Sequence, residues 1–274
     1  FPDNTSVLPK TVAVTGSNGK STTSALIYHI LNSSNVNAQI GGNIGTPLFD
    51  LNPASIVKNT VMELSSYQIE VAKVLIPDIA VFLNFAPDHL DRHGGIGGYF
   101  SAKRRLFNSD RAQVSVVGVD EKEGLAITSD LRSKKKSQLI TISTKLDLTF
   151  DDWSIFSDGI NLFEAKLGKI VTKLDITNLA GLLGIHNLQN VCAAYAVCRV
   201  LKILPEDIFI ALKSYKALPH RAELLATLSG VKFINDSKAT NATSTISALN
   251  LSSFSLPYIS TKSDSNGTGL GLYI

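Results

Sequence analysis

Residues 12–23, with the sequence VAVTGSNGKSTT, combine residue types that bind phosphate groups. They predict a buried strand, a tight glycine turn and a helix that begins near Lys20. Backbone N–H groups in such a turn point inward and, with the positive end of the helix dipole, form a cradle for phosphate oxygens. Lys20 would pair with the terminal phosphates, and the Ser21 hydroxyl would be placed to bind a nucleotide-associated Mg²⁺. We therefore predict a phosphate-binding loop here.

The loop meets the usual pattern, G-x-x-x-x-G-K-[ST], only in part, because Val14 stands where the first glycine is expected. The loop works at this length if the strand runs directly into the turn, as residues 11–14 suggest. The alternative is a surface turn with an incidental lysine, and the strand before and the helix after favour the loop. The expected nucleotide-binding residues of the loop are Gly16, Ser17, Asn18, Gly19, Lys20, Ser21 and Thr22.

Two further strands are expected to end in polar side chains at the same edge of the sheet. Glu63 closes an apolar strand, so its carboxylate should emerge at the carboxyl edge, where open α/β folds bind ligands. It would hold the Mg²⁺ that Ser21 also contacts, or else simply reach solvent. The strand at 79–85 delivers a polar string at its end, made of Asn84, Asp88, His89, Asp91, Arg92 and His93. They fit a second metal position or a polar loop with locally satisfied histidines, and their spacing does not decide between the two.

Other polar residues are less specific taken singly. Asn43 lies in the glycine-rich run 41–45, GGNIG, which could approach a ligand closely or form an ordinary loop. Lys103 lies in a helix after the His89 loop, where a solvated lysine is the simpler interpretation. Asn187 and Asn190 lie three residues apart at the start of a helix and so share one face, where they would cap the helix or read a purine edge.

The elements that must position these residues alternate between strand and helix through the first half of the chain. Strands are predicted at 11–15, 60–63, 79–85, 114–119 and 139–142, and helices at 20–33, 67–74 and 99–107. This alternation is typical of a parallel sheet covered by crossover helices.

The second half changes character. From 149 to 176, short alternating runs separated by turn residues predict an antiparallel meander. Two helices are expected to follow, at 187–201 and 205–215. After Leu218 the sequence resembles a strand–helix–strand pattern that would open another domain.

Composition excludes several classes of protein. The chain has 274 residues, 44% of them hydrophobic and 18% charged, which is typical of a folded protein with a sizeable core. The net charge of +3 is too small to indicate a nucleic-acid partner, and the basic run 132–136 is interpreted as a solvated loop. Without a membrane span or a signal segment, we expect no membrane association and a cytoplasmic location. Cys192 and Cys198 are interpreted as buried packing residues of a reducing compartment.

Eight strings spread over residues 11–249 together resemble the Mur ligase family of peptidoglycan synthesis, and within it the members that add D-glutamate. They are TGSNGKST, GGNIG, ELSSYQIE, NFAPDHLDRH, AKRRLF, GIHNLQN, LPHRAE and INDSKATN. Folylpolyglutamate-synthase-like ligases share the phosphate loop but would lack ELSSYQIE followed by INDSKATN. The resemblance implies an α/β fold with a P-loop mononucleotide-binding parallel sheet, flanking helices, a small antiparallel meander and the start of a Rossmann-like C-terminal domain.

The resemblance also implies roles for single residues. Lys20 resembles the phosphate-loop lysine, Ser21 and Glu63 resemble ligands of a first Mg²⁺, and His89 resembles a ligand of a second. Lys103 matches a lysine that is carbamylated in the family, which turns an ammonium that repels a metal into an anion that binds one. The remaining implied contacts are Asn43 and Ser66 near the muramoyl substrate, Asn187 and Asn190 at adenine, Arg221 and Asp236 at the nucleotide with His220 beside them, and Lys238 and Thr240 near the acidic substrates.

The implied activity is ATP-dependent amide formation with Mg²⁺, by a monomer. A carboxylate of UDP-N-acetylmuramoyl-L-alanine would attack the γ-phosphate of ATP, and the amine of D-glutamate would then displace phosphate from the acyl phosphate. Several anions must be neutralised together, which is the expected task of Lys20, the loop amides and two Mg²⁺. Lys20, Glu63, His89 and Lys103 are the expected catalytic residues.

The expected domain division is 1–217 for the central ATP-binding domain, 218–254 for the start of the family's C-terminal domain, and 255–274 for a tail from outside the family. Phe1 is not an initiator methionine, so we expect upstream sequence, including the family's first domain, to be missing. An inactive nucleotide-binding fragment is therefore the alternative to a working ligase. The tail, with its GTGLGL string, resembles the ATP-lid segment of sensor histidine kinases. It is interpreted as a fusion or reading-frame scar, or as a flexible tail without function.

Overall fold

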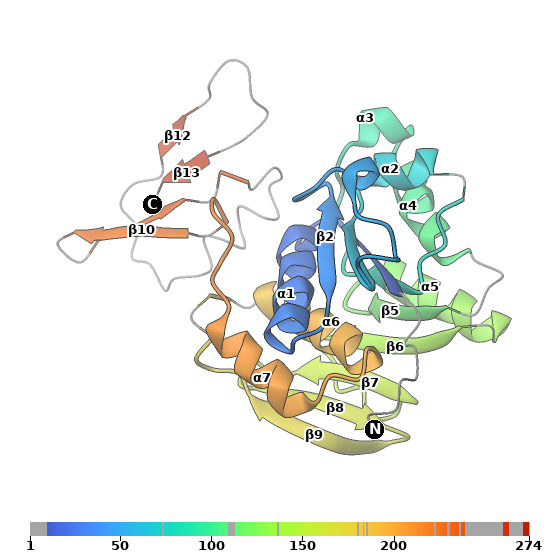
Figure 1. The fold of residues 1–274 in the computed structure, drawn as a ribbon. Coiled ribbons are helices and arrows are strands. Elements are labelled where there is room, and N and C mark those ends of the chain that lie inside the picture. Colours follow the sequence, from blue (N-terminus) through green and yellow to red (C-terminus); the bar gives the residue numbers. More distant parts are fainter. Residues whose placement is uncertain are drawn as a thin grey trace.

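The protein, seen in a computed structural model, is organised around a nine-stranded sheet with the order β2-β3-β1-β4-β5-β6-β7-β8-β9 (Figure 1). The structure describes residues 10–72, 74–108, 113–135, 137–179, 181–182, 184, 186–221, 223–228, 231–235, 237–238, 260–262 and 271–273. The strands of this sheet are β1 (Lys10–Thr15), β2 (Ala38–Gly42), β3 (Asn59–Glu63), β4 (Ile79–Phe82), β5 (Val114–Gly118), β6 (Gln138–Ser143), β7 (Trp153–Ser157), β8 (Asn161–Lys166) and β9 (Lys169–Asp175).

The sheet is parallel from β2 through β7 and antiparallel from β7 through β9. The predicted parallel sheet and the predicted meander are both confirmed, and β7 joins them into one sheet. Strand β1 lies between β3 and β4, so the carboxyl ends of these three strands meet. The strand order changes direction there, which is where open α/β sheets bind ligands.

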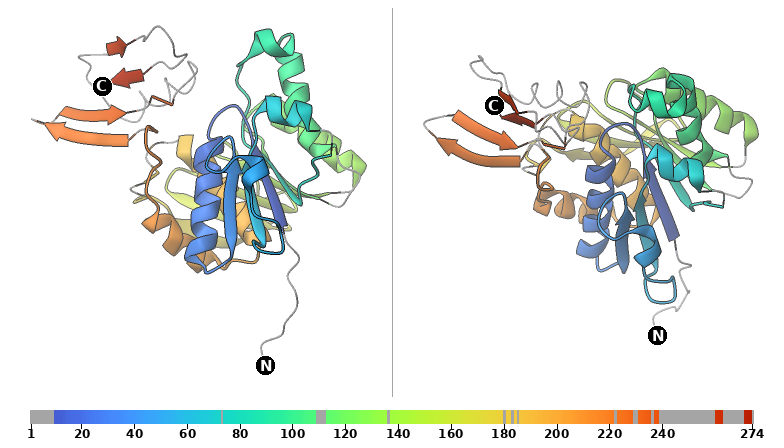
Figure 2. Two further views of the ribbon diagram at one scale, coloured as in Figure 1. Left: turned by 45° about the horizontal axis from the view of Figure 1, so that its top comes forward. Right: turned by 90° about the horizontal axis from the view of Figure 1, so that it is seen from above.

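Helices cover both faces of the sheet (Figures 1 and 2). One face carries α1 (Lys20–Ser33), α6 (His186–Val200) and α7 (Pro205–Ser214), and the other carries α2 (Ser66–Val71), α4 (Ile96–Arg104) and α5 (Lys122–Lys134). Short helices are η1 (Leu48–Asp50), α3 (Leu90–His93) and η2 (Arg105–Phe107). Val12 and Val14 of β1 pack into the first core and Ala13 into the second. Burial on both faces explains why β1 reads as a continuous apolar run.

The core of the meander holds α6 in place through one buried carboxylate. Glu164 of β8 is fully buried and accepts hydrogen bonds from Tyr195 (2.8 Å) and Arg199 (3.0 Å) of α6. Lys166 lies 3.0 Å from the same carboxylate. Burial alone would raise the pKa of Glu164, but these hydrogen bonds outweigh it and lower the pKa. Helix α6 therefore has a fixed position relative to the sheet.

Two predictions about the first half of the chain were incomplete or wrong. Strand β2 was not predicted, because it is an edge strand without an apolar run and its last residues, Gly41 and Gly42, read as a turn. The basic run 132–136 does not form a loop throughout, since Arg132 and Lys134 lie in the last turn of α5. Cations are favourable there because they face the negative end of the helix dipole.

The described chain after Leu218 begins with a hairpin rather than the predicted strand–helix–strand pattern. β10 (Glu223–Leu228) and β11 (Val231–Asn235) pair antiparallel, with two residues between them that leave no room for a helix. β12 (Ser260–Lys262) and β13 (Gly271–Tyr273), both from the segment 255–274, complete a four-stranded sheet of order β10-β11-β13-β12 (Figure 2).

Two expectations from composition can be compared with the described residues. None of the helices in the described ranges has both the length and the apolar character needed to cross a membrane. Cys192 and Cys198 are fully buried free cysteines of α6, as predicted, and burial raises the pKa of both thiols.

Candidate functional site

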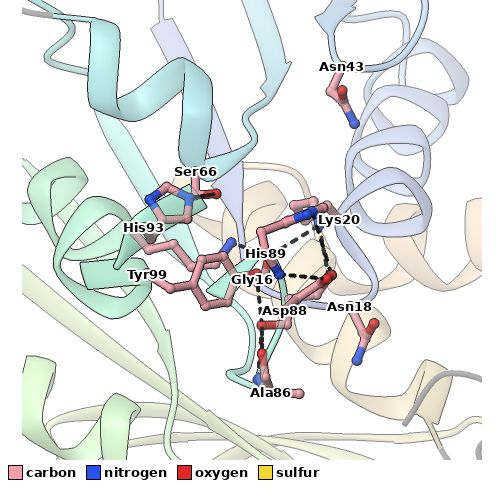
Figure 3. Close-up of polar contacts among 12 residues, drawn as sticks. Gly16, Asn18, Lys20, Asn43, Ser66, Ala86, Asp88, His89, His93 and Tyr99 are labelled. Carbon is pink, nitrogen blue, oxygen red and sulfur yellow. Dashed lines mark hydrogen bonds and ion pairs between the residues drawn. The ribbon is translucent and has the colours of Figure 1, made fainter. Parts of the chain in front are cut away.

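The predicted phosphate loop lies where β1 ends and α1 begins, at the carboxyl edge of the sheet (Figure 3). Gly19 precedes α1 with a left-handed backbone (φ 80°), and no side chain caps this helix. A Cβ atom on Gly19 would collide with the side-chain amide of Asn190. The glycine is therefore required twice, for its backbone angle and for its close approach to α6. Its missing side chain leaves the first turn of α1, including Lys20, Ser21 and Thr22, uncapped and suited to an anion.

Two lysines, the partly buried Lys20 and the buried Lys103, donate to one carbonyl oxygen of the loop. Lys20 Nζ donates to Gly16 O (3.1 Å) and Ser17 O (2.8 Å), and Lys103 Nζ donates to the same Gly16 O (2.7 Å). Burial lowers the pKa of Lys20, an effect that Arg221 increases and Glu63 opposes. Burial and the nearby Lys20 lower the pKa of Lys103 well below its usual value. The solvated Lys103 of the simpler interpretation is therefore wrong, since its side chain is 1% exposed.

Glu63 has the geometry expected of a metal ligand. It is the last residue of β3, is 1% exposed, and accepts a hydrogen bond at Oε1 from Asn43 Nδ2 (3.0 Å). Its Oε2 is buried, and the described residues provide it with no hydrogen-bond partner. A buried carboxylate oxygen without a donor is costly unless a cation completes it. The residues present thus fit a bound Mg²⁺ at Glu63, and the solvent-exposed alternative is wrong.

Ser21 is a second oxygen donor of this region and already has a protein partner. Its hydroxyl is 5% exposed and accepts a hydrogen bond from Arg221 NH2 (2.6 Å). Arg221 lies 200 residues further along the chain, so the linker after α7 reaches back to the loop. Ser21 retains a lone pair and its own hydrogen for a further ligand.

The polar string after β4 divides into an exposed and a buried part. His89 is about half exposed, with φ 50° and its Nε2 3.7 Å from Asp88. His93 is 2% exposed at its side chain, and its Nε2 lies 2.9 Å from Ser66 Oγ. Burial lowers the pKa of His93. Figure 3 shows where the two histidines lie. The ring of Tyr67 contacts the rings of both.

The described residues include no group of three His, Cys, Asp or Glu side chains placed to hold a metal. A second metal at His89 would therefore need ligands of another kind, such as a modified Lys103 or oxygens of a bound substrate. Asp91 and Arg92 belong to α3, and Arg92 pairs with Glu70 at 3.6 Å.

The two helix asparagines lie beside the loop. Asn190 is 3% exposed, accepts from Thr23 Oγ1 of α1 (3.1 Å) and donates to Asn187 Oδ1 (2.9 Å). Neither helix capping nor purine recognition describes Asn190 fully, because its side-chain amide joins α6 to α1. Asn187 is 9% exposed at the start of α6.

The residues after Arg221 are described only in part. Asn235 Nδ2 lies 2.7 Å from His220 Nδ1, and the backbone N–H of Lys238 donates to His220 O (3.3 Å). Lys238 itself is exposed. Asp236 and Thr240 lie outside the described residues.

Sequence reasoning missed one aromatic residue and the polar residues that hold the loop from outside. Tyr99 is 1% exposed, its hydroxyl lies 3.2 Å from Ser17 Oγ, and burial raises its pKa to about 12. Lys103 Nζ lies 4.5 Å from the centre of its ring. The spacing of Tyr99 and Lys103, four residues apart on one helix, was the available signal that they share a face. Ser17 also exchanges hydrogen bonds with the backbone of Ala86.

The chain can now be compared with known proteins. The family model "Mur ligase middle domain" matches residues 14–198. A UDP-N-acetylmuramoylalanine--D-glutamate ligase of Ruegeria pomeroyi is 47% identical over 248 residues, which is 90% of this chain and 53% of that protein. The same-named enzyme of Roseobacter denitrificans is 49% identical over 247 residues, again 90% and 53%. The chain thus spans about half the length of the curated relatives it matches.

Solved structures show the same fold at low sequence identity. MurF from Acinetobacter baumannii superposes with a TM-score of 0.67 at 23% identity, covering 88% of this chain and 53% of that one. MurF ligase from Thermotoga maritima in complex with ADP gives a TM-score of 0.64 at 22% identity, covering 88% and 57%. The family model covers more than half of the chain, and the relatives and the fold agree with it. The chain belongs to the Mur ligase family.

Proposed function

We propose that this chain binds ATP with Mg²⁺ in the loop formed by residues 16–22. The observation that carries the proposal is the convergence of two lysines, Lys20 and Lys103, on Gly16 O beside the uncapped start of α1. Two desolvated ammonium groups this close to each other repel, and an anion bound between them would relieve the repulsion. The ADP bound by the Thermotoga maritima neighbour supports the same ligand class.

Within this proposal the loop residues have different tasks. The first turn of α1, from Gly19 to Thr22, offers backbone N–H groups to phosphate oxygens, and Lys20 neutralises their charge. Ser17 and Asn18 shape the loop from within. Asn187, Asn190, Arg221 and Asp236 remain the proposed contacts to the rest of the nucleotide.

Glu63 and Ser21 would hold the first Mg²⁺, and His89 with a carbamylated Lys103 would hold a second. Bound Mg²⁺ would supply charge neutralisation for the phosphates. Lys103 suits carbamylation because only a neutral amine attacks CO₂, and its lowered pKa increases the neutral fraction. Asn43 would orient the Glu63 carboxylate through its hydrogen bond to Oε1 (3.0 Å).

We further propose that the chain is part of a ligase that joins D-glutamate to UDP-N-acetylmuramoyl-L-alanine. The names and the 47% and 49% identities of the two relatives support this. A substrate carboxylate would attack the γ-phosphate of ATP and release ADP, and the amine of D-glutamate would then expel phosphate as the amide forms. Ser66, Lys238 and Thr240 are the proposed substrate contacts, and the enzyme would act in the cytoplasm as a monomer.

The domain division proposed is 1–217 for nucleotide binding, 218–254 for the start of a further domain and 255–274 for a tail. Nucleotide binding and turnover are separate proposals, because the relatives extend over about twice the matched length. Calorimetric titration with ATP and Mg²⁺ tests the first, and phosphate release with both acceptor substrates tests the second. Binding without release would support a nucleotide-binding unit that lacks ligase activity by itself.

A further inference from the structure

One residue outside the loop holds the backbone of two loop residues. Asn84, which follows β4, accepts the Ser17 N–H at its carbonyl oxygen (3.0 Å) and the Asn18 N–H at its side-chain Oδ1 (2.8 Å). Its Nδ2 donates back to the Asn18 carbonyl oxygen (3.2 Å). These three hydrogen bonds fix the two residues directly before Gly19, and therefore the point at which α1 begins.

The orientation of the Asn84 amide is decided by its next neighbour. The second hydrogen of Asn84 Nδ2 is donated to Gln189 Oε1 of α6 at 2.8 Å. Gln189 in turn donates its Nε2 to Asp120 Oδ2 at 3.4 Å. Gln189 is 7% exposed, so a reversed amide would leave polar atoms unpaired in a buried place.

Asn84, Gln189 and Asp120 thus form a chain of hydrogen-bonded side chains, called the relay below. It ends on a carboxylate, which can only accept hydrogen bonds. Asp120 follows β5, and its carboxylate accepts from Ser143 Oγ (2.5 Å) and from the Thr144 N–H (3.1 Å) and hydroxyl (3.0 Å). An ionised carboxylate has no hydrogen to donate, so Gln189 must turn its NH₂ group toward Asp120. Its oxygen then faces Asn84, and the Asn84 oxygen faces the Asn18 N–H.

We propose that Gln189 is a positioning residue of the phosphate loop. Because Asp120 accepts the Gln189 NH₂ group, Gln189 presents its oxygen to Asn84, and Asn84 presents its own oxygen to the loop backbone at Asn18. The inference rests on the proposed nucleotide binding, since it concerns the affinity of the loop for a phosphorylated ligand. Gln189 acts only through Asn84 and belongs to neither the phosphate cradle nor the metal ligands. With the relay intact, the N–H groups at the start of α1 are held ready for phosphate before the ligand arrives.

A structural role alone would predict a loss of stability and nothing more, so the test separates the two. Gln113 provides the matched control, because it is also a buried glutamine (4% exposed) whose Nε2 donates to backbone carbonyls, those of Pro77 (2.9 Å) and Leu106 (3.4 Å). It precedes β5 and so lies at the opposite edge of the sheet from the loop. Gln189→Leu and Gln113→Leu remove the same group at two places.

The measurement is calorimetric titration of each variant with ATP and Mg²⁺, together with its thermal unfolding. We expect Gln189→Leu to weaken ATP binding by about tenfold or more, because the Asn84 amide loses the contact that fixes its orientation toward the Asn18 N–H. Gln113→Leu should keep the affinity within about twofold even though it loses two hydrogen bonds to backbone carbonyls. Equal ATP affinity in the two variants would overturn the inference.

Lys20→Ala separates this outcome from a failure of the proposed function. If Lys20→Ala weakens ATP binding and Gln189→Leu does not, the relay is wrong and the loop is still the nucleotide site. If neither variant changes the affinity, nucleotide binding in this loop is itself wrong, and the relay is wrong with it.

A second pair of variants covers the case that Gln189→Leu does not fold. Gln189→Glu keeps an oxygen toward Asn84 but places a carboxylate against Asp120, so ATP binding should weaken. Adding Asp120→Asn supplies an amide that can donate to the new carboxylate, and the affinity should return to within about threefold of Asp120→Asn alone. Absence of this rescue would contradict the proposed relay.

Discussion

At the scale of single residues, Lys20 and Lys103 dominate the electrostatics of the site. Both ammonium groups donate to Gly16 O, and both have a lowered pKa because they are removed from water. The negative charge of nearby Glu63 opposes this lowering at Lys20 but does not cancel it. In the proposed nucleotide complex, favourable contacts to an anion would replace this unfavourable pair of cations.

The lowered pKa of Lys103 predicts how stability depends on pH. The unfolded state keeps an ordinary lysine pKa, so between the two pKa values it binds more protons than the folded state, and stability rises with pH. The penalty for burying the charge is complete below the folded pKa and vanishes above about 10.5, the ordinary value. Lys103→Met avoids it, so this variant should gain stability over the wild type at pH 7 and lose that advantage toward pH 10.

Chemical denaturation at several pH values in CO₂-free buffer measures this difference. Each unit of lowered pKa corresponds to about 1.4 kcal/mol, less the hydrogen bond to Gly16 that the variant loses. A stability difference that does not change between pH 7 and pH 10 would show that Lys103 titrates normally in the folded protein.

Glu63→Gln tests the metal ligand without changing its shape. The variant keeps an oxygen for Asn43 but loses the negative charge at the buried Oε2 position, so Mg²⁺ should strengthen ATP binding less than in the wild type. Titrations with and without Mg²⁺ should show the gain reduced by about tenfold, as expected when one coordinating charge is lost. Glu206→Gln in the exposed first turn of α7 is the control and should behave as the wild type. An undiminished Mg²⁺ effect in Glu63→Gln would exclude Glu63 as the ligand.

At the scale of elements, the site depends on how closely α6 approaches the start of α1. Thr23 of α1 donates to Asn190 of α6, and Gly19 lies against the same amide. Helix α6 is held in turn by Glu164 of the meander. A β-hairpin element far from the loop in sequence therefore supports the helix that borders it.

Gly19→Ala should damage the loop and the fold together. The added Cβ meets the Asn190 amide, and the left-handed backbone is unfavourable for alanine by about 1 kcal/mol or more. We expect the free energy of unfolding to fall by about 2 kcal/mol and ATP binding to weaken. Gly159→Ala, in an open turn with a similar backbone (φ 94°), carries the same backbone cost without a collision and without an effect on ATP. Equal ATP affinity in both variants would refute the steric account.

Glu164→Leu should destabilise the protein through the groups it leaves behind. Arg199, Lys166 and Tyr195 would lose their buried acceptor, which typically costs about 3 kcal/mol or more. Urea unfolding measures the loss, and Glu206→Leu on the exposed face is the comparison. Simultaneous replacement of Glu164 and Arg199 by leucine should recover part of the stability. A loss below about 1 kcal/mol for Glu164→Leu would mean that the cluster is not truly buried.

The predictability of these elements follows from their burial. The strands at 11–15 and 60–63 and the helix at 20–33 were predicted nearly to the residue, because each has an apolar pattern and α1 has a glycine turn before it. The edge strand β2 was not predicted, because it is only half-buried and ends in two glycines, and the hairpin after Leu218 was predicted as strand–helix–strand instead. The loop motif located the lysine, but the relay through Gln189 is a contact between distant segments that spacing does not encode.

At the scale of the whole molecule, residues from three other parts of the chain converge on one loop. Lys103 and Tyr99 come from α4, Asn190 comes from α6, and Arg221 reaches Ser21 from the linker beyond α7. Convergence at the carboxyl edge of a parallel sheet is the usual place for a ligand site. This convergence supports the proposal that the nucleotide site lies within the part of the chain that matches the family's middle domain.

The most direct test of this account is calorimetric titration of the chain with ATP and Mg²⁺, run in parallel on Lys20→Ala. We predict saturable binding to the wild type and a loss of affinity of at least about tenfold in the variant, because the terminal phosphates lose their cation. Binding of equal strength to both proteins, or no binding to either, would contradict the assignment of residues 16–22 as the nucleotide site.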